Sequence, residues 1–174
     1  MRYFPILSAI LALLAIPVSG QESEVPKAEI FGGYQFTHIE ANLNTNGWTA
    51  SLTGNATPYL GVTADFSGVY KSVSGANLSG YSYTFGPTVS LNHHGVVNPF
   101  VHALFGGAHL GASVSGLGSA GANGFTMMYG GGVDAKVSSR FAVRVVEADW
   151  VYFRFSGQSV RGNARVATGI VFRF

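Results

Sequence analysis

Apolar and polar residues alternate with a period of two along most of the chain after residue 27. At the C-terminus, Phe174, Phe172 and Ile170 fall on one side of an extended strand, whereas Arg173 and Arg165 fall on the other. Such alternation is typical of β-strands whose two faces meet different surroundings. It predicts eight strands, around the segments AEIFGGYQF, GWTASLTG, YLGVTADF, GYSYTFGP, PFVHALFG, GFTMMYGG, FAVRVVEA and NARVATGI. In PFVHALFG both parities are apolar, so the pattern does not decide which side faces inward.

The connections between these strands alternate between short and long. Expected short turns lie around 57–58, 92–98 and 138–140, and expected long loops are 37–46, 71–80, 111–123 and 155–162. Strands of about 10 residues are long enough to cross a bilayer when tilted, and closure into a barrel pairs every strand edge. The fold class predicted is therefore all-β: an eight-stranded antiparallel up-and-down transmembrane β-barrel.

The alternative is a soluble eight-stranded barrel that holds a small ligand, as lipocalins do. That fold requires apolar residues inside and charged residues outside. Here only 10% of residues are charged, against about 25% in an average soluble domain, and the apolar parity carries almost no charge. We therefore expect the apolar side to face lipid. The net charge of +2 is too small to suggest a nucleic-acid partner.

The first 20 residues, MRYFPILSAILALLAIPVSG, have the features of a secretory signal peptide: an early arginine, an apolar run, and small residues at the end. A membrane helix is the alternative, but the run of about 14 residues is shorter than the roughly 20 needed to span. The expected organisation is a signal peptide at 1–20, a short periplasmic segment at 21–26 and the barrel at 27–174. The absence of cysteine excludes disulfides and a lipid anchor on cysteine.

Three segments, IFGGYQF, YGGGVDAKVSSRFAVRVVEADW and TGIVFRF, resemble in order and spacing the OmpA-like outer-membrane β-barrel family. The resemblance implies a monomer in the bacterial outer membrane with both termini in the periplasm, surrounded by outer-membrane lipid and lipopolysaccharide. It also implies that the barrel-assembly machinery recognises the end of the last strand, at Ile170, Phe172 and Phe174. Some family members carry a further peptidoglycan-binding domain, and we expect this chain to lack that function because it stops at the barrel.

Charged residues gather on the parity that should face the barrel interior. Arg144 and Glu147 are three apart, so strict alternation would place one of them in lipid. A bulge at Val145 and Val146 would turn both inward together with Asp149. The expected interior charge network is Glu29, Asp65, Asp134, Lys136, Arg144, Glu147, Asp149, Arg165 and Arg173. Such a set is expected to plug the interior with ion pairs, and the alternative is a gated pore or proton path.

Other candidate sites in the sequence are weak. His93 and His94 are adjacent in an expected turn, and His102 and His109 have opposite parities, so no metal site is predicted. The segment GLGSAG matches a dinucleotide-binding pattern but precedes no helix, and the chain has no His-x-Ser of the kind that lipid A deacylases use. We therefore predict no catalytic, cofactor or metal site. Contact with lipopolysaccharide phosphates is expected from three cations near the extracellular rim: Lys71, Arg154 and Arg161.

The function predicted from the sequence is structural: a barrel that contributes to envelope integrity, or one that interacts with other surfaces through its extracellular loops. A narrow pore is the first alternative, and a lipid A-modifying enzyme is the second.

Overall fold

The computed structural model describes residues 25–40, 43–73, 76–91, 95–114, 118–155 and 157–174. The expected signal peptide, most of the expected periplasmic segment, and both His93 and His94 lie outside the described residues.

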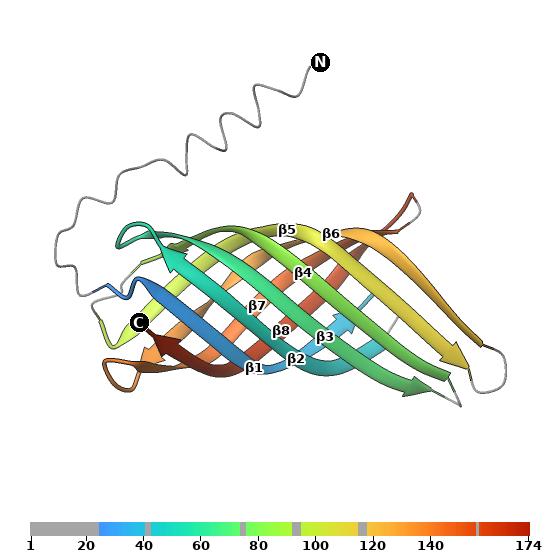
Figure 1. Cartoon of the computed structure of the whole chain (residues 1–174), viewed down its shortest axis with the longest axis horizontal. Coiled ribbons are helices and arrows are strands. Elements are labelled where there is room, and N and C mark those ends of the chain that lie inside the picture. The colour runs from blue at the N-terminus through green and yellow to red at the C-terminus, as the bar shows by residue number, and fades with distance from the viewer. Residues whose placement is uncertain (1–24, 41–42, 74–75, 92–94, 115–117, 156) are drawn as a thin grey trace, which may run out of the picture.

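Eight antiparallel strands form one closed barrel in which each strand pairs with its neighbours in sequence and the last pairs with the first (Figure 1). This confirms the predicted fold class. The strands are β1 Ala28–Ile39, β2 Leu43–Asn55, β3 Leu60–Val73, β4 Ala76–Ser90, β5 Val97–Val114, β6 Gly118–Lys136, β7 Phe141–Phe155 and β8 Gln158–Arg173.

Pairing of β1 with β8 closes the barrel. Its register runs from Glu29 opposite Arg173 to His38 opposite Ala164, and the amide of Phe174 donates a hydrogen bond of 2.9 Å to the carbonyl of Ala28. The start of β1 and the C-terminus therefore lie at the same end (Figure 1). We call this end, with connections 56–59, 91–96 and 137–140, the terminal rim. The opposite end, with connections 40–42, 74–75, 115–117 and 156–157, is the hairpin rim.

The prediction of four long loops is wrong, because the strands continue through most of these segments. β5 and β6, for example, pair from Val97 opposite Ala135 to Val114 opposite Gly118. These segments are rich in Gly, Ser and Asn, and their side chains weaken the alternation. The ladder is nevertheless built from backbone groups, which pair whatever the side chain is. At the β7–β8 turn, Gly157 has a φ of 85°, which favours glycine.

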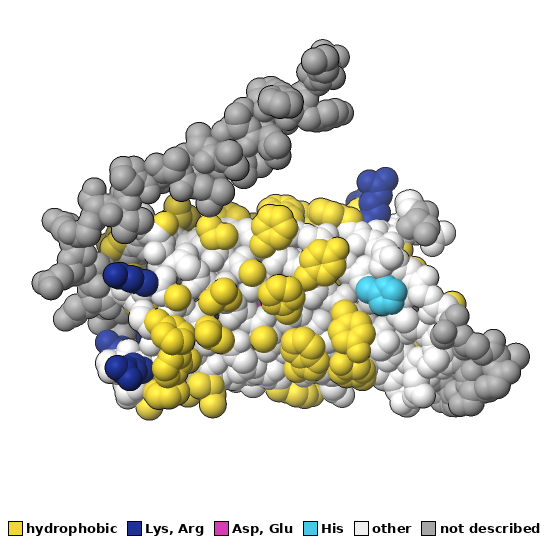
Figure 2. All heavy atoms as spheres, viewed as in Figure 1, with side chains coloured by type: hydrophobic (Ala, Val, Ile, Leu, Met, Phe, Trp, Pro, Cys, Tyr) yellow, Lys and Arg dark blue, Asp and Glu magenta, His cyan; other side chains and the backbone are white. Residues whose placement is uncertain are grey.

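The outer surface of the barrel is apolar. The side chains expected to face outward do so on every strand where the sequence predicted a direction, as Tyr34, Phe66 and Ile170 illustrate with exposed fractions of 54%, 52% and 60%. Figure 2 shows hydrophobic side chains over the middle of the visible face, with Lys and Arg only toward the ends. Among the described residues, no helix is long and apolar enough to cross a membrane.

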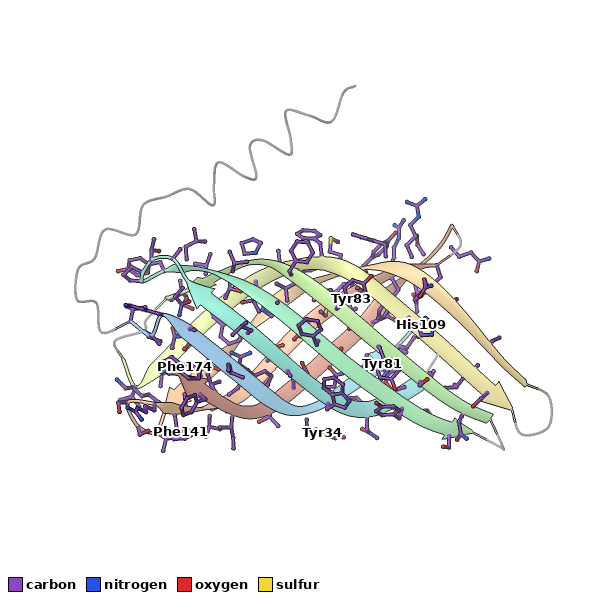
Figure 3. All side chains as sticks on the ribbon, in the orientation of Figure 1. Tyr34, Tyr81, Tyr83, His109, Phe141 and Phe174 are labelled. Atoms are coloured by element: carbon purple, nitrogen blue, oxygen red, sulfur yellow. The ribbon has the colours of Figure 1, made fainter. Side chains whose placement is uncertain are left out.

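Aromatic residues with polar tips gather on the outer surface toward the hairpin rim. The indole nitrogen of Trp48 donates to the hydroxyl of Tyr70 at 3.4 Å, and that hydroxyl donates to Tyr81 at 3.2 Å. Tyr81 and His109 lie toward this rim, whereas Phe141 and Phe174 lie at the terminal rim (Figure 3). Amphipathic rings at both ends of an apolar band are typical of the two interfaces of a membrane barrel.

The bulge predicted in β7 is confirmed. The pairing of β7 with β8 shifts register between Arg144 and Glu147, and Val145 and Val146 are both exposed on the outside. Arg144, Glu147 and Asp149 all point inward as a result. One additional residue in the strand thus allows charges three apart to share one face.

Deletion of Val145 is expected to leave a regular strand that still folds. With one residue fewer between them, Arg144 and Glu147 are two apart, so strict alternation turns both inward without a bulge. The compact, heat-modifiable band on an unheated gel should be kept. The matched variant, deletion of Ala148, makes Glu147 and Asp149 adjacent, so one of the two must face lipid and the band should be largely lost. Loss of the band in the Val145 deletion, or its retention in the Ala148 deletion, would contradict this account of the bulge.

Candidate functional site: the barrel interior

Arg165 of β8 is the centre of a cross-barrel ion-pair network. Its guanidinium donates to Asp65 on β3 at 2.9 Å, to Glu147 on β7 at 2.6 Å and to Asp149 on β7 at 2.8 Å. Thr49 on β2 joins the group by donating to Asp65 at 3.1 Å. All of these side chains are buried. One guanidinium thus connects strands from opposite sides of the barrel, which backbone pairing alone does not do.

Arg144 forms the second centre, one level nearer the terminal rim. Its guanidinium makes a two-point contact with Asp134 at 2.8 and 3.1 Å, and a third bond of 2.5 Å to Glu147. The rings of Phe31 and Phe100 lie on it, with centroids 4.2 and 4.3 Å from Cζ. Arg is suited to this position because its planar group stacks on aromatic rings while it binds carboxylates at its edge.

Two glycines make room for the ring of Phe31. A Cβ atom at Gly33 or at Gly169 would lie 2.8 Å from a carbon of that ring. The two glycines are paired across β1 and β8, so the seam of the barrel is thin where the ring lies. Both positions must therefore be glycine for the Phe31 ring to pack against Arg144.

Nearer the terminal rim, Arg173 donates to Glu29 at 2.7 Å. Both side chains are buried and lie opposite each other on β8 and β1. This third ion pair belongs to the same strand seam that closes the barrel.

The sequence did not place His102 in the network. The structure turns it inward from β5, where its Nε2 lies 2.7 Å from a carboxylate oxygen of Asp149. Both parities of β5 are apolar, so alternation could not decide its direction. His109 faces outward from the same strand and contacts Asn123.

Lys136 does not belong to the interior network, contrary to the sequence-based expectation. It is the last residue of β6 and is exposed at the terminal rim, where water solvates its amine at no burial cost. The other eight predicted charges are buried. The described network therefore has five carboxylates and three guanidinium groups, with His102 as a further titratable partner, and is less balanced than expected.

The network leaves almost no free space. The cavity among its side chains, bordered by Asp65, Arg144 and Glu147, measures about 10 Å³, room for about one water molecule. An eight-stranded barrel is just wide enough for side chains to fill it. At this level the geometry is that of a plug.

A metal ion is not needed to explain this cluster. His102, Glu147 and Asp149 bring ligand atoms within 4.8 Å of one another. Both carboxylates already pair with Arg165, whose positive charge balances theirs without a bound cation. We assign no metal site to it.

The described histidines make no contacts that indicate nucleophilic catalysis. His102 contacts Asp149, while His38 and His109 contact Asn44 and Asn123 at the surface. A His–carboxylate pair needs an accessible hydroxyl or thiol on its other side to activate a nucleophile. The pair at His102 is buried in the ion-pair network instead.

The half of the interior near the hairpin rim is mostly apolar, which the sequence did not predict. Leu104, Met128 and Val151 form a buried cluster on the hairpin-rim side of the network, and Phe153 packs against it. Val69 and Leu110 continue the apolar lining toward the rim. Polar residues share this lining, because Thr37, Ser67 and Ser82 border the same space.

The remaining predicted residues lie near the two rims. Ile170 and Phe174 are exposed on the outside of the barrel end, and Phe172 stacks edge-on with Phe174 and Phe141 at 4.6 and 5.0 Å between ring centroids. Toward the hairpin rim, Arg154 and Arg161 are exposed on neighbouring strands. Lys71 is not beside them, because its amine donates to the carbonyl of Asn44 between β2 and β3.

Solved structures of small outer-membrane barrels match this architecture over most of its length. Ail, the attachment invasion locus protein of Yersinia pestis, is 18% identical with a TM-score of 0.61 and covers 86% of this chain and 99% of its own. Neisserial surface protein A is 12% identical with a TM-score of 0.65, covering 87% and 98%. The N-terminal β-barrel domain of OprF from Pseudomonas aeruginosa is 14% identical with a TM-score of 0.56, covering 86% and 99%.

The chain has the fold of the small eight-stranded outer-membrane β-barrels. No protein-family model matches the sequence, and no curated protein matches it. At these identities the likeness concerns the fold, and the interior and rims of this barrel must be interpreted from their own residues.

Replacement of Arg165 by Met is expected to lower the free energy of unfolding by about 3–5 kcal/mol, because three buried carboxylates lose their common partner. Urea titration in lipid vesicles, followed by tryptophan fluorescence, measures the change. The control, Arg161→Met, alters an exposed arginine and should shift stability by no more than about 0.5 kcal/mol. Equal effects of the two variants would refute the central role of Arg165.

Proposed function

We propose that the protein is an integral barrel of the bacterial outer membrane, closed to ions, with a structural or surface-interaction role. The observation that carries this proposal is the sealed interior: the ion pairs of Arg144 and Arg165 fill the lumen and leave about 10 Å³ among them. The closed hydrogen-bond ladder and the apolar outer surface support a position in lipid. The closed lumen disfavours a diffusion pore.

The orientation proposed places both termini in the periplasm and the hairpin rim outside the cell. An even number of strands puts the start of β1 and the end of β8 at one rim, as observed. The outward apolar groups Ile170, Phe172 and Phe174 at the end of β8 support recognition by the barrel-assembly machinery at that rim. They are accessible at the edge that must pair last with β1.

Arg154 and Arg161 are proposed to contact lipopolysaccharide phosphates. Both are exposed on adjacent strands near the hairpin rim, and no described carboxylate lies within ion-pair distance of either guanidinium. The nearby carboxylate of Glu40 accepts from the backbone amides of Arg161 and Gly162 at 3.3 and 3.1 Å. Arginine forks match phosphate oxygens well, so lipid A headgroups fit this surface. Lys71 remains a weaker candidate because its amine already has a partner.

A closed barrel in the outer membrane makes two measurable predictions. The protein should fractionate with the outer membrane as a heat-modifiable band, and planar bilayers that contain it should show no sustained, well-defined channel openings. Arg161→Met, which leaves the network intact, is the control for stray conductance. Stable unitary openings in the wild type would refute the closed role and favour the pore, while a band in the soluble fraction would refute the location.

Replacement of Lys71, Arg154 and Arg161 together by Gln is expected to reduce the lipopolysaccharide that co-purifies with the folded barrel, because the phosphates lose their cationic partners. The matched control changes Lys136 and Arg140, which are exposed at the terminal rim, to Gln. Only the first variant should lose lipopolysaccharide by mass spectrometry. Equal retention by both variants would refute the contact.

A further inference from the structure

The apolar half of the barrel interior contains a cavity of about 130 Å³. Val69, Leu110, Val151, Phe153 and Val160 line its walls, and Met128 lies at its floor. The lining extends to Ile39 and Phe155, the last residues of β1 and β7. The cavity therefore approaches the hairpin rim, while the ion-pair network closes the opposite side.

The size and lining of this cavity suit a small apolar molecule. An apolar cavity of about 150 Å³ stays dry and accepts benzene. Side chains that border such a space lack partner atoms on one side and gain dispersion contacts when a ligand fills it. The excess of carboxylates in the network below disfavours an anionic ligand, and the Arg165 guanidinium there already has three carboxylate partners.

One polar atom at the cavity has no hydrogen-bond partner among the described residues. Gln35 lines the cavity, is 1% exposed, and its Oε1 atom has no hydrogen-bond partner among the described residues. The hydroxyls of Ser67 and Ser82, which also line the cavity, bond to each other at 2.7 Å. A buried amide oxygen without a partner costs free energy that a donating ligand hydroxyl would recover.

We propose that this cavity binds a neutral, apolar molecule of about the size of a benzene ring that carries one hydrogen-bonding group. The ring or short alkyl chain lies between Val69, Val151 and Phe153, and its hydroxyl contacts the amide of Gln35. The molecule enters from the hairpin rim. This binding site is additional to the closed, structural role, which holds whether or not the cavity is occupied.

Two adjacent methionines allow a direct test. Met128 points into the cavity floor, whereas Met127 is on the outer face of the same strand. Phenol is added to the folded barrel in nanodiscs with ¹³C-methyl methionine, and Met127→Leu and Met128→Leu assign the signals. The Met128 methyl should shift with saturation. The Met127 methyl reports simple partition into lipid and should shift weakly and linearly.

Substitutions separate the cavity from the membrane. Ala108 lines the cavity and Ala148 faces outward, so Ala108→Phe should weaken phenol binding at least about 10-fold, whereas Ala148→Phe should leave it unchanged. Val69→Phe fills the same space if Ala108→Phe does not fold. Gln35→Leu should weaken phenol binding about 2- to 10-fold and leave toluene binding unchanged.

Several outcomes would overturn the proposal. If the Met128 shift is linear and parallel to that of Met127, the cavity binds nothing. If both filling variants fold and leave the phenol curve unchanged, the ligand lies elsewhere. If Gln35→Leu weakens phenol and toluene equally, the amide does not recognise the hydroxyl. None of these results bears on conductance or outer-membrane location, so failure here is distinguishable from failure of the proposed function.

Discussion

The pairing of β1 with β8 is the interaction on which the rest of this structure depends. In lipid, an unpaired backbone N–H or C=O group costs several kcal/mol, so a sheet with free edges is not stable there. Closure satisfies both edges at once, and the register from Glu29 opposite Arg173 to His38 opposite Ala164 achieves it over ten residue pairs. Once eight strands are closed, the interior has a set width, and side chains must fill it.

The interior charges follow from that width. A charge inside a narrow barrel is removed from bulk water and needs partners of opposite sign. Arg165 and Arg144 supply them by reaching carboxylates on β3, β6 and β7. Glu147 contacts both arginines and joins the two centres. Because these contacts cross the lumen, they restrict the cross-section of the barrel and leave a space of only about 10 Å³ among them.

The two halves of the interior are filled by different kinds of contact. Near the terminal rim, ion pairs and hydroxyls fill the space with bonds of defined direction. Toward the hairpin rim, Leu104, Met128 and Val151 cover the network with apolar contacts. Beyond them the barrel contains a cavity. Gln35 lies where the two halves meet. The division makes the proposed closure to ions compatible with the proposed binding of a small neutral molecule.

The sequence alone determined the fold class, the outward face of seven strands and the bulge in β7. These are local consequences of period-two alternation and of the cost of placing Arg144 or Glu147 in lipid. Only the tertiary structure decided which parity of β5 faces inward, which placed His102 beside Asp149. It also decided that Lys136 lies at the rim, that the expected loops are strands, and that a cavity opens above the network. The physical reason is that these features depend on strand register and on residues distant in the chain. The alternation within a single strand contains no information about either.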